Sequence, residues 1–236
     1  MLFSLLQGGS IQDIIISLLL TLPIVLFALC IHETAHGWVA WKCGDSTAYN
    51  MGRLTLNPLK HLDPIGTVCM LLIGYGWANP VPVNTRNFRN PRKGMALTAA
   101  AGPGANMLVG LISAIVAGIL YGLQYKFFAT SPSELVFNIY SWTYTFFFLG
   151  AQINFTYMIF NLIPLPPFDG SRIAYVFLPD RIYFGVMRYE RQILMGVLIG
   201  MMVLTNFTNF SFGSGAMWLT DLISENVAKL IFSLIH

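Results

Sequence analysis

Long runs of apolar residues are the feature that most restricts how this chain can fold. The strongest run covers residues 14–40, and two others cover residues 94–121 and 135–163. Each is longer than the roughly 20 helical residues that cross a hydrocarbon core of about 30 Å. Because a helix satisfies its backbone hydrogen bonds internally, these runs predict membrane-spanning helices.

The composition supports the same class. Of the 236 residues, 56% are hydrophobic and only 10% are charged, whereas a soluble domain carries about 25% charged residues. We therefore expect an integral membrane protein whose surface faces the lipid bilayer. The net charge of +3 is too small to indicate a nucleic-acid partner. The three cysteines lack C-x-x-C spacing and are expected to be small buried hydrophobes.

Weaker segments complete the predicted fold. Residues 193–207 form a fourth candidate span, and residues 65–78 form an apolar run too short to cross easily, which favours a re-entrant or interfacial element. In residues 43–63, the pairs Asn57-Pro58 and Asp63-Pro64 bracket short runs that we interpret as strands or hairpins.

The C-terminal segment has a different pattern, because Asp221, Glu225 and Lys229 fall on one stripe of a helix. This pattern favours a helix lying at the membrane interface. The sequence thus predicts an all-α polytopic membrane protein with about four to six membrane helices. A small β or re-entrant element is expected between the first two strong spans, and residues 1–236 are expected to form a single domain.

Positive residues predict the orientation of the chain. Two basic clusters, at residues 86–93 and 172–191, flank the open end of the hairpin formed by residues 94–121 and 135–163. Cytoplasmic loops carry an excess of Lys and Arg, so this end is expected to face the cytoplasm. We expect a multi-pass protein of the cell membrane and no cleavable signal peptide.

The first apolar run contains the sequence I-H-E-T-A-H at residues 31–36. On a helix, His32 and His36 project from one face, one turn apart, so both imidazoles can reach one metal ion. Glu33 stands beside the first ligand and can accept a proton from a metal-bound water. Ionisable residues inside a membrane indicate function by default. The alternative is a hydrogen-bonded cluster between helices without a metal.

A catalytic zinc takes three protein ligands and keeps one position open. The best candidate for the third is Asp169, in the sequence N-L-I-P-L-P-P-F-D-G at residues 161–170, whose prolines must break the preceding helix. His36 precedes Lys42 by about 9 Å of helix, and Asp169 lies just before Arg172, so both are expected toward the cytoplasmic side. The alternative is that Asp169 and Gly170 only form a surface turn.

The combination of H-E-T-A-H with N-x-x-P-x-P-x-x-D-G resembles the site-2 protease family of intramembrane zinc metalloproteases. Further similar stretches are GRLTLNPLKHLDPIG (52–66), GWANPVPVN (76–84), RNPRKGMAL (89–97) and the A-G-P-x-x-N element ending at Asn106. The resemblance covers residues 25–175 and fits the compact prokaryotic type without PDZ or CBS domains. Phe168 departs from the family, which often has leucine there.

The resemblance implies a set of roles. His32, His36 and Asp169 match the Zn²⁺ ligands, Glu33 matches the catalytic glutamate, and Asn161 matches an asparagine that steadies the transition state. The implied reaction is hydrolysis of peptide bonds within or next to transmembrane helices of substrate proteins. An alternative for Asn161 is that it only satisfies backbone groups near the helix break.

Substrate-binding candidates are Asn79, Val81, Val83 and Asn106. The first three lie in an extended, proline-limited segment that can pair with an unwound substrate strand. Asn106 either faces the site or bonds across helices, with Gly102 allowing close approach. The remaining alternative for the whole chain is a non-enzymatic membrane protein that binds or transports a divalent metal. The pattern identifies neither the substrate nor the oligomeric state.

Overall fold

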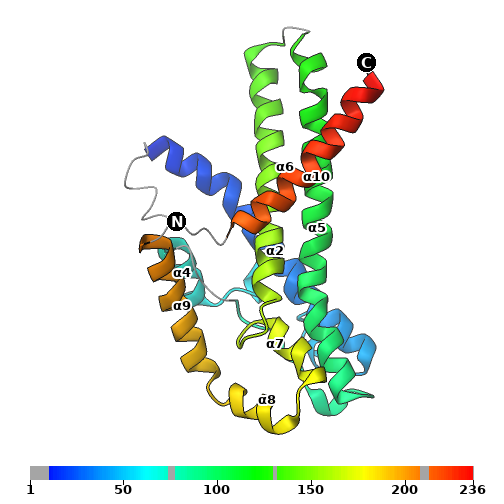
Figure 1. The fold of residues 1–236 in the computed structure, drawn as a ribbon, viewed down its shortest axis with the longest axis vertical. Coiled ribbons are helices and arrows are strands. Elements are labelled where there is room, and N and C mark those ends of the chain that lie inside the picture. The colour runs from blue at the N-terminus through cyan, green and yellow to red at the C-terminus, as the bar shows by residue number, and fades with distance from the viewer. Residues whose placement is uncertain (1–10, 74–77, 130–131, 208–212, 236) are drawn as a thin grey trace. The chain divides into compact units, whose positions relative to one another are not determined.

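The computed structural model describes residues 11–73, 78–129, 132–207 and 213–235, and in these ranges the chain is helical (Figure 1). The elements are α2 (Ile11–Cys43), α3 (Thr47–Asn50), η1 (Pro58–Lys60), α4 (Pro64–Ile73), η2 (Thr85–Asn87), α5 (Pro91–Phe128), α6 (Glu134–Asn161), α7 (Asp169–Ala174), η3 (Tyr175–Phe177), α8 (Asp180–Met187), α9 (Glu190–Phe207) and α10 (Ser214–Ile235). The all-helical prediction is confirmed for these residues.

Among the described residues, two helices are long and apolar enough to cross a membrane. These segments are Ile15–Cys43 of α2 and Pro91–Gln124 of α5. They coincide with the first two strong apolar runs of the sequence.

The prediction of strands or hairpins over residues 43–63 is wrong. That region contains α3 and η1, and the one extended pairing among the described residues is an isolated antiparallel bridge between Leu62 and Ala78. The physical reason is that Asn-Pro and Asp-Pro pairs also begin helices. The Asn or Asp side chain caps the first free amides of the helix, and the proline occupies the first helical position. Asn57 accepts a hydrogen bond from the Leu59 amide, and Asp63 accepts one from the Gly66 amide.

The predicted re-entrant element at residues 65–78 is described only in part. Helix α4 has 10 residues, and residues 74–77 lie outside the described residues.

The chain divides into two compact units. Unit 1 consists of Met1–Ala105 and Asn161–Ile199, and unit 2 consists of Asn106–Phe160 and Gly200–His236. Each unit contains parts of α5, α6 and α9, because the three boundaries fall inside or at the ends of these helices.

In unit 1, α2 ends in a Schellman motif. Gly44 has a φ of 115°, its amide donates to the Trp41 carbonyl, and the Asp45 amide donates to the Ala40 carbonyl. The chain thereby turns sharply, and Asp45 becomes fully buried. Its carboxylate accepts hydrogen bonds from Thr47, Asn84 and Asn87.

These hydrogen bonds set the charge state of Asp45. Burial alone raises the pKa of its carboxyl, but the hydrogen bonds from the side chains and amides of Thr47, Asn84 and Asn87 outweigh burial and lower it below the ordinary value. Asp45 therefore fastens residues 84–87 to the end of α2 as an ionised acceptor.

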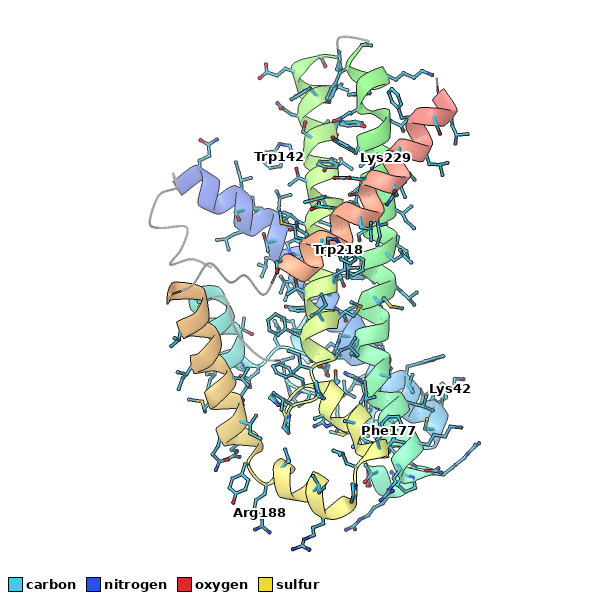
Figure 2. The ribbon with its side chains drawn as sticks, in the orientation of Figure 1. Lys42, Trp142, Phe177, Arg188, Trp218 and Lys229 are labelled. Carbon is cyan, nitrogen blue, oxygen red and sulfur yellow. The ribbon has the colours of Figure 1, made fainter. Side chains whose placement is uncertain are left out.

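In unit 2, the included parts of α5, α6 and α10 pack closely (Figure 1). A core of Ala114, Ala151, Phe155 and Ala216 joins the three helices. A Cβ at Gly118 of α5 would lie 2.6 Å from the Ser224 carbonyl oxygen of α10, so a glycine is required for this approach. Trp142 of α6 and Trp218 of α10, both labelled in Figure 2, are 45% and 62% exposed.

Candidate metal centre

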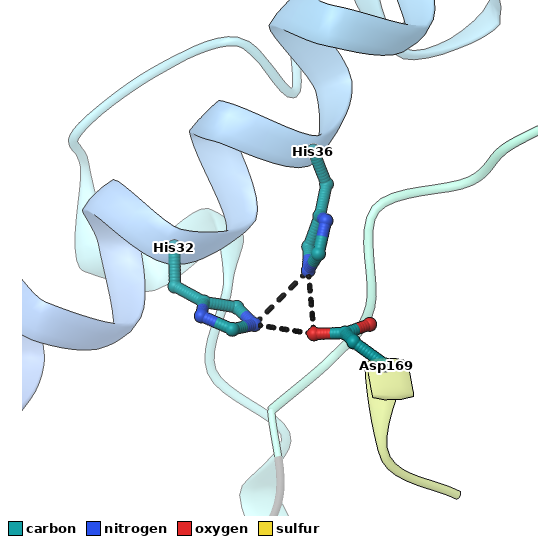
Figure 3. Close-up of side chains that lie close together, drawn as sticks. All are labelled: His32, His36 and Asp169. Carbon is teal, nitrogen blue, oxygen red and sulfur yellow. Dashed lines mark hydrogen bonds and ion pairs between the residues drawn. The ribbon is translucent and has the colours of Figure 1, made fainter. Parts of the chain in front are cut away.

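Helix α2 supplies two of the three candidate ligands. His32 and His36 project from the same face of α2, one turn apart, as their spacing predicted (Figure 3). Their side chains are buried, with 8% and 9% of each residue exposed.

The first residue of α7 supplies the third. Asp169 follows the proline-containing stretch after α6 and is 6% exposed. The next residue, Gly170, packs on backbone, because a Cβ there would lie 2.3 Å from the carbonyl oxygen of Leu162 and 2.5 Å from that of Ile163. Glycine at position 170 therefore allows the chain to fold back and bring the start of α7 against the residues that follow Asn161.

The three side chains meet in a nearly equilateral triangle (Figure 3). The Nε2 atoms of His32 and His36 are 3.0 Å apart, and Asp169 Oδ2 lies 3.1 Å from each. Ligand bonds of about 2.0–2.2 Å in tetrahedral geometry would separate ligand atoms by about 3.3 Å. The triangle is thus close to one face of a zinc tetrahedron, and the fourth position is left to a non-protein ligand.

A backbone carbonyl determines the tautomer of His36. Its Nδ1 lies 2.7 Å from the carbonyl oxygen of Thr98 in α5. A carbonyl only accepts, so Nδ1 carries the proton and the Nε2 of a neutral imidazole presents its lone pair to the triangle. Such an outer partner is typical of a metal-ligating histidine.

The approach of α5 leaves a space beside both imidazoles. A Cβ built on Gly102 would lie 2.5 Å from His36 Nε2 and 2.6 Å from His32 Nε2. A zinc ion lies about 2.0–2.1 Å from each ligating nitrogen. The volume kept free by the missing side chain of Gly102 therefore adjoins the position at which the two nitrogens converge, and the residues present fit a metal ion.

Charge also favours a cation at this position. Glu33 is 9% exposed, and its Oε2 accepts a hydrogen bond of 2.9 Å from the Val81 amide. Neither Glu33 nor Asp169 forms an ion pair with Lys or Arg within the residues that the structure describes. Two buried carboxylates without a Lys or Arg partner are costly, and a divalent cation would balance them.

The structure places the other candidates as follows. Asn161 is the last residue of α6 and is partly buried. The amides of Asn79 and Val81 already donate, to the His61 carbonyl and to Glu33 respectively. These two amides are therefore not available to a substrate strand in this structure.

The candidate Asn106 takes the second of its two predicted roles. It is fully buried, and its Nδ2 donates to Asn154 Oδ1 across α5 and α6, at 3.3 Å. Asn154 was not identified from the sequence, although an asparagine in an apolar run is itself a signal for such a pair.

Three further groups at the site were also missed. They are the Thr98 carbonyl, the space at Gly102 and the Val81 amide. The Thr98 carbonyl and the Val81 amide are backbone groups, so the sequence predicts only the helix or the extended segment in which each lies. Gly102 was recognised as a close-approach residue, and its approach to the histidines is the new finding.

A buried His-His-carboxylate triangle beside a glutamate is an arrangement that metallopeptidases use, and both histidines lie on an apolar helix long enough to cross a membrane. The model of peptidase family M50 matches residues 20–205. The chain belongs to peptidase family M50. Its apolar helices and this membership make it a membrane protein, and the family recognition made from the sequence is confirmed.

Curated relatives agree with this membership. The chain is 41% identical over 155 residues to "Putative zinc metalloprotease YwhC" of Bacillus subtilis, which covers 66% of this chain and 67% of that protein. It is 31% identical over 150 residues to "Putative zinc metalloprotease Rip2" of Mycolicibacterium smegmatis, covering 61% and 52%. The chain thus spans about half the length of that Rip2. No solved structure gives a significant match.

Proposed function

We propose that this chain is an intramembrane zinc endopeptidase that hydrolyses peptide bonds within or next to transmembrane helices of other proteins. The observation that carries the proposal is the buried triangle of His32, His36 and Asp169, with the Gly102 space beside it and Glu33 next to the first histidine. Membership of family M50 and the names of the relatives support the same activity and zinc as the metal.

The residues of the chain divide the work of hydrolysis. His32, His36 and Asp169 hold the ion, which when bound lowers the pKa of a coordinated water to about 7 and polarises a carbonyl oxygen. Glu33 would take the proton from the attacking water and then return it to the leaving amine. The Val81 hydrogen bond occupies Glu33 Oε2 and leaves Oε1 for this transfer.

Asn161 is proposed as a donor to the oxyanion of the tetrahedral intermediate. Support comes from the fold of the following residues, since Gly170 lies against the carbonyls of Leu162 and Ile163. The end of α6 is thereby held beside the start of α7, where Asp169 lies. Loss of one oxyanion donor typically costs about 2.7–4 kcal/mol of transition-state stabilisation.

Substrates are proposed to be transmembrane proteins that unwind locally at the cut. A helix encloses its amides in its own hydrogen bonds, so helix-breaking residues near the cut favour cleavage. Pairing of the unwound strand with the extended segment 79–84 remains our proposal, with Val83 as its centre because the amides of Asn79 and Val81 are already engaged.

The membrane arrangement is proposed from sequence and helix lengths together. Besides α2 and α5, the 28-residue α6 and the 18-residue α9 are the further proposed spans, which gives four, and α4 is the described part of the proposed re-entrant element. The basic clusters at 86–93 and 172–191 support an active site toward the cytoplasmic side of the cell membrane. The family match covers parts of both units, which supports one metalloprotease domain over residues 1–236.

The alternative is a metal carrier without catalytic activity. A transport path through a membrane is lined by ionisable groups at several depths. In the described part of the chain, the triangle is the one cluster of His, Cys, Asp or Glu with metal-binding geometry. This favours the endopeptidase over the carrier.

The decisive experiment is Glu33→Gln in the purified full chain, with zinc content and cleavage of a transmembrane test peptide both measured. The endopeptidase reading expects zinc to be retained and cleavage to be lost. If the variant cleaves at the wild-type rate, Glu33 is not the general base. If neither form cleaves membrane peptides while both bind zinc, the carrier is the better description.

A further inference from the structure

Residues 79–84, N-P-V-P-V-N, form an extended segment that we call the 79–84 strap. It is attached to the rest of unit 1 at three points along its length. The Asn79 amide donates to the His61 carbonyl at 2.8 Å, the Val81 amide donates to Glu33 Oε2 at 2.9 Å, and the Asn84 amide donates to Asp45 Oδ2 at 2.7 Å.

The prolines of the strap limit which of its amides can donate hydrogen bonds. Pro80 and Pro82 have no amide proton, whereas the amides of Asn79 and Val81, two residues apart, both donate to unit 1. Arg53 adds a tether, since its Nη2 donates to the carbonyls of Asn79 and Pro80 at 2.8 and 3.3 Å.

The side chain of Val81 is seated next to the glutamate that its amide contacts. Val81 is 7% exposed, and a Cβ on Gly37 would lie 3.1 Å from Val81 Cγ1. Gly37 follows Glu33 by one helical turn, so the face of α2 that bears Glu33 is the face that receives Val81. This packing holds the Val81 amide within hydrogen-bond distance of the Glu33 carboxylate.

His61 connects the same strap to α2 by a second route. Its side chain is fully buried and its Nε2 donates to the Thr55 carbonyl, which also accepts from Thr34 Oγ1 on α2. Its own carbonyl accepts from Asn79. The register of the strap relative to α2 is therefore fixed on both sides of Val81, by His61 at one end and by Asp45 at the other.

From these contacts we propose that the Val81 backbone amide is a positioning group for Glu33, and that the 79–84 strap exists to hold it there. The amide binds Oε2 and orients the carboxylate so that Oε1 is presented to the reacting water. A charged, buried acceptor makes this hydrogen bond stronger than a neutral one. This inference rests on the proposed function, in which Glu33 moves the proton.

The test compares two substitutions at one position in the full chain. Val81→Pro removes the amide proton, and Val81→Ala keeps it while shortening the side chain. With a fluorogenic transmembrane peptide, we expect Val81→Pro to lower kcat by about 10–100-fold, as removal of an outer-shell partner typically does. KM and zinc content should stay close to wild type, and Val81→Ala, which keeps the amide proton, should lower kcat by a smaller factor than Val81→Pro does.

Three results would overturn the inference. Wild-type kcat in Val81→Pro would show that the amide does not matter, and a raised kcat would show that the strap inhibits. An equal loss in Val81→Ala would assign the effect to packing. If Val81→Pro loses zinc or fails to fold, an amide-to-ester exchange at residue 81 removes the same proton without introducing the proline ring. The kcat of this ester variant is then judged by the same three outcomes.

A second measurement does not depend on cleavage and separates this inference from the proposed function. In chain labelled with ¹⁵N-valine, the Val81 amide proton should resonate downfield and move upfield in Glu33→Gln, because the charged acceptor is lost. An unmoved resonance overturns the inference whatever the activity. A shifted resonance in a chain that cleaves no peptide supports the contact and contradicts the proposed endopeptidase instead.

Discussion

Replacing Gly102 by alanine should strongly weaken metal binding. The added Cβ would lie 2.5 Å from His36 Nε2 and from His32 Cε1, and 2.6 Å from His32 Nε2. Non-bonded carbon contacts are comfortable at about 3.5 Å or more, so the overlap is about 1 Å. Ligand distances in a metal site vary by only about 0.2 Å. Either α5 or the imidazoles must move by more than the site tolerates.

The magnitude follows from the displacement. Loss of a single outer-shell partner costs about 10–100-fold in metal affinity, and here the two first ligands themselves are pushed out of place. We expect zinc affinity to fall by at least about 100-fold, which corresponds to about 2.8 kcal/mol, and cleavage to fall with it.

The assay needs a control from the same helix. Zinc content after dialysis against a weak chelator, together with the visible spectrum of the cobalt-substituted protein, measures the site directly. Gly104→Ala is the matched control, since a Cβ at position 104 meets nothing within 4 Å. It should retain zinc and be as stable as wild type or slightly more so. Stoichiometric zinc bound with unchanged affinity in Gly102→Ala would refute the assignment of the triangle as the metal site.

Three further experiments test the packing in unit 1 and in unit 2. Asp45→Asn should cost about 1–3 kcal/mol of stability at pH 7. The pKa of Asp45 is lower in the folded protein than in the unfolded chain, so the ionised carboxylate stabilises the fold at pH values above the unfolded pKa of about 3.9. This stabilisation is lost as the pH falls below that value. The thermal unfolding temperatures of wild type and Asp45→Asn, measured in detergent, should therefore converge in acid. For Asn106 and Asn154, a double-mutant cycle of unfolding free energies should give a coupling of about 0.6 kcal/mol, and zero coupling would remove the pair as an interhelical contact. Gly118→Val should separate α10 from α5 at the Ser224 carbonyl, seen as faster hydrogen exchange in α10, whereas unchanged exchange would contradict the packing.

The chemically active side chains were accessible from the sequence because their spacing carries the signal. His32 and His36 are one helical turn apart, and Asp169 follows a proline-rich break that only a folded-back chain accommodates. The meeting of these three groups, required by the sequence argument, is present in the structure. Their assignment as ligands still depends on the metal measurements above.

The fold between the first two spans was misjudged for a local reason. Asn57-Pro58 and Asp63-Pro64 have the composition of turns, and turn formers between short apolar runs favour hairpins. The same dipeptides are also N-caps followed by proline at the first helical position. No pattern within a window of this length separates the two outcomes, and the helical one forms because α3 and η1 pack on α2.

The partners of the site were hidden from the sequence because they act through backbone. The Thr98 carbonyl sets the tautomer of His36, the Val81 amide holds Glu33, and Gly102 contributes by having no side chain. A side-chain motif therefore identifies the reacting groups, whereas their orientation depends on where distant backbone passes α2. It follows that side-chain truncation at Thr98 or Val81 is a weak test of the site. Substitutions that delete an amide proton or add a Cβ test the site more directly.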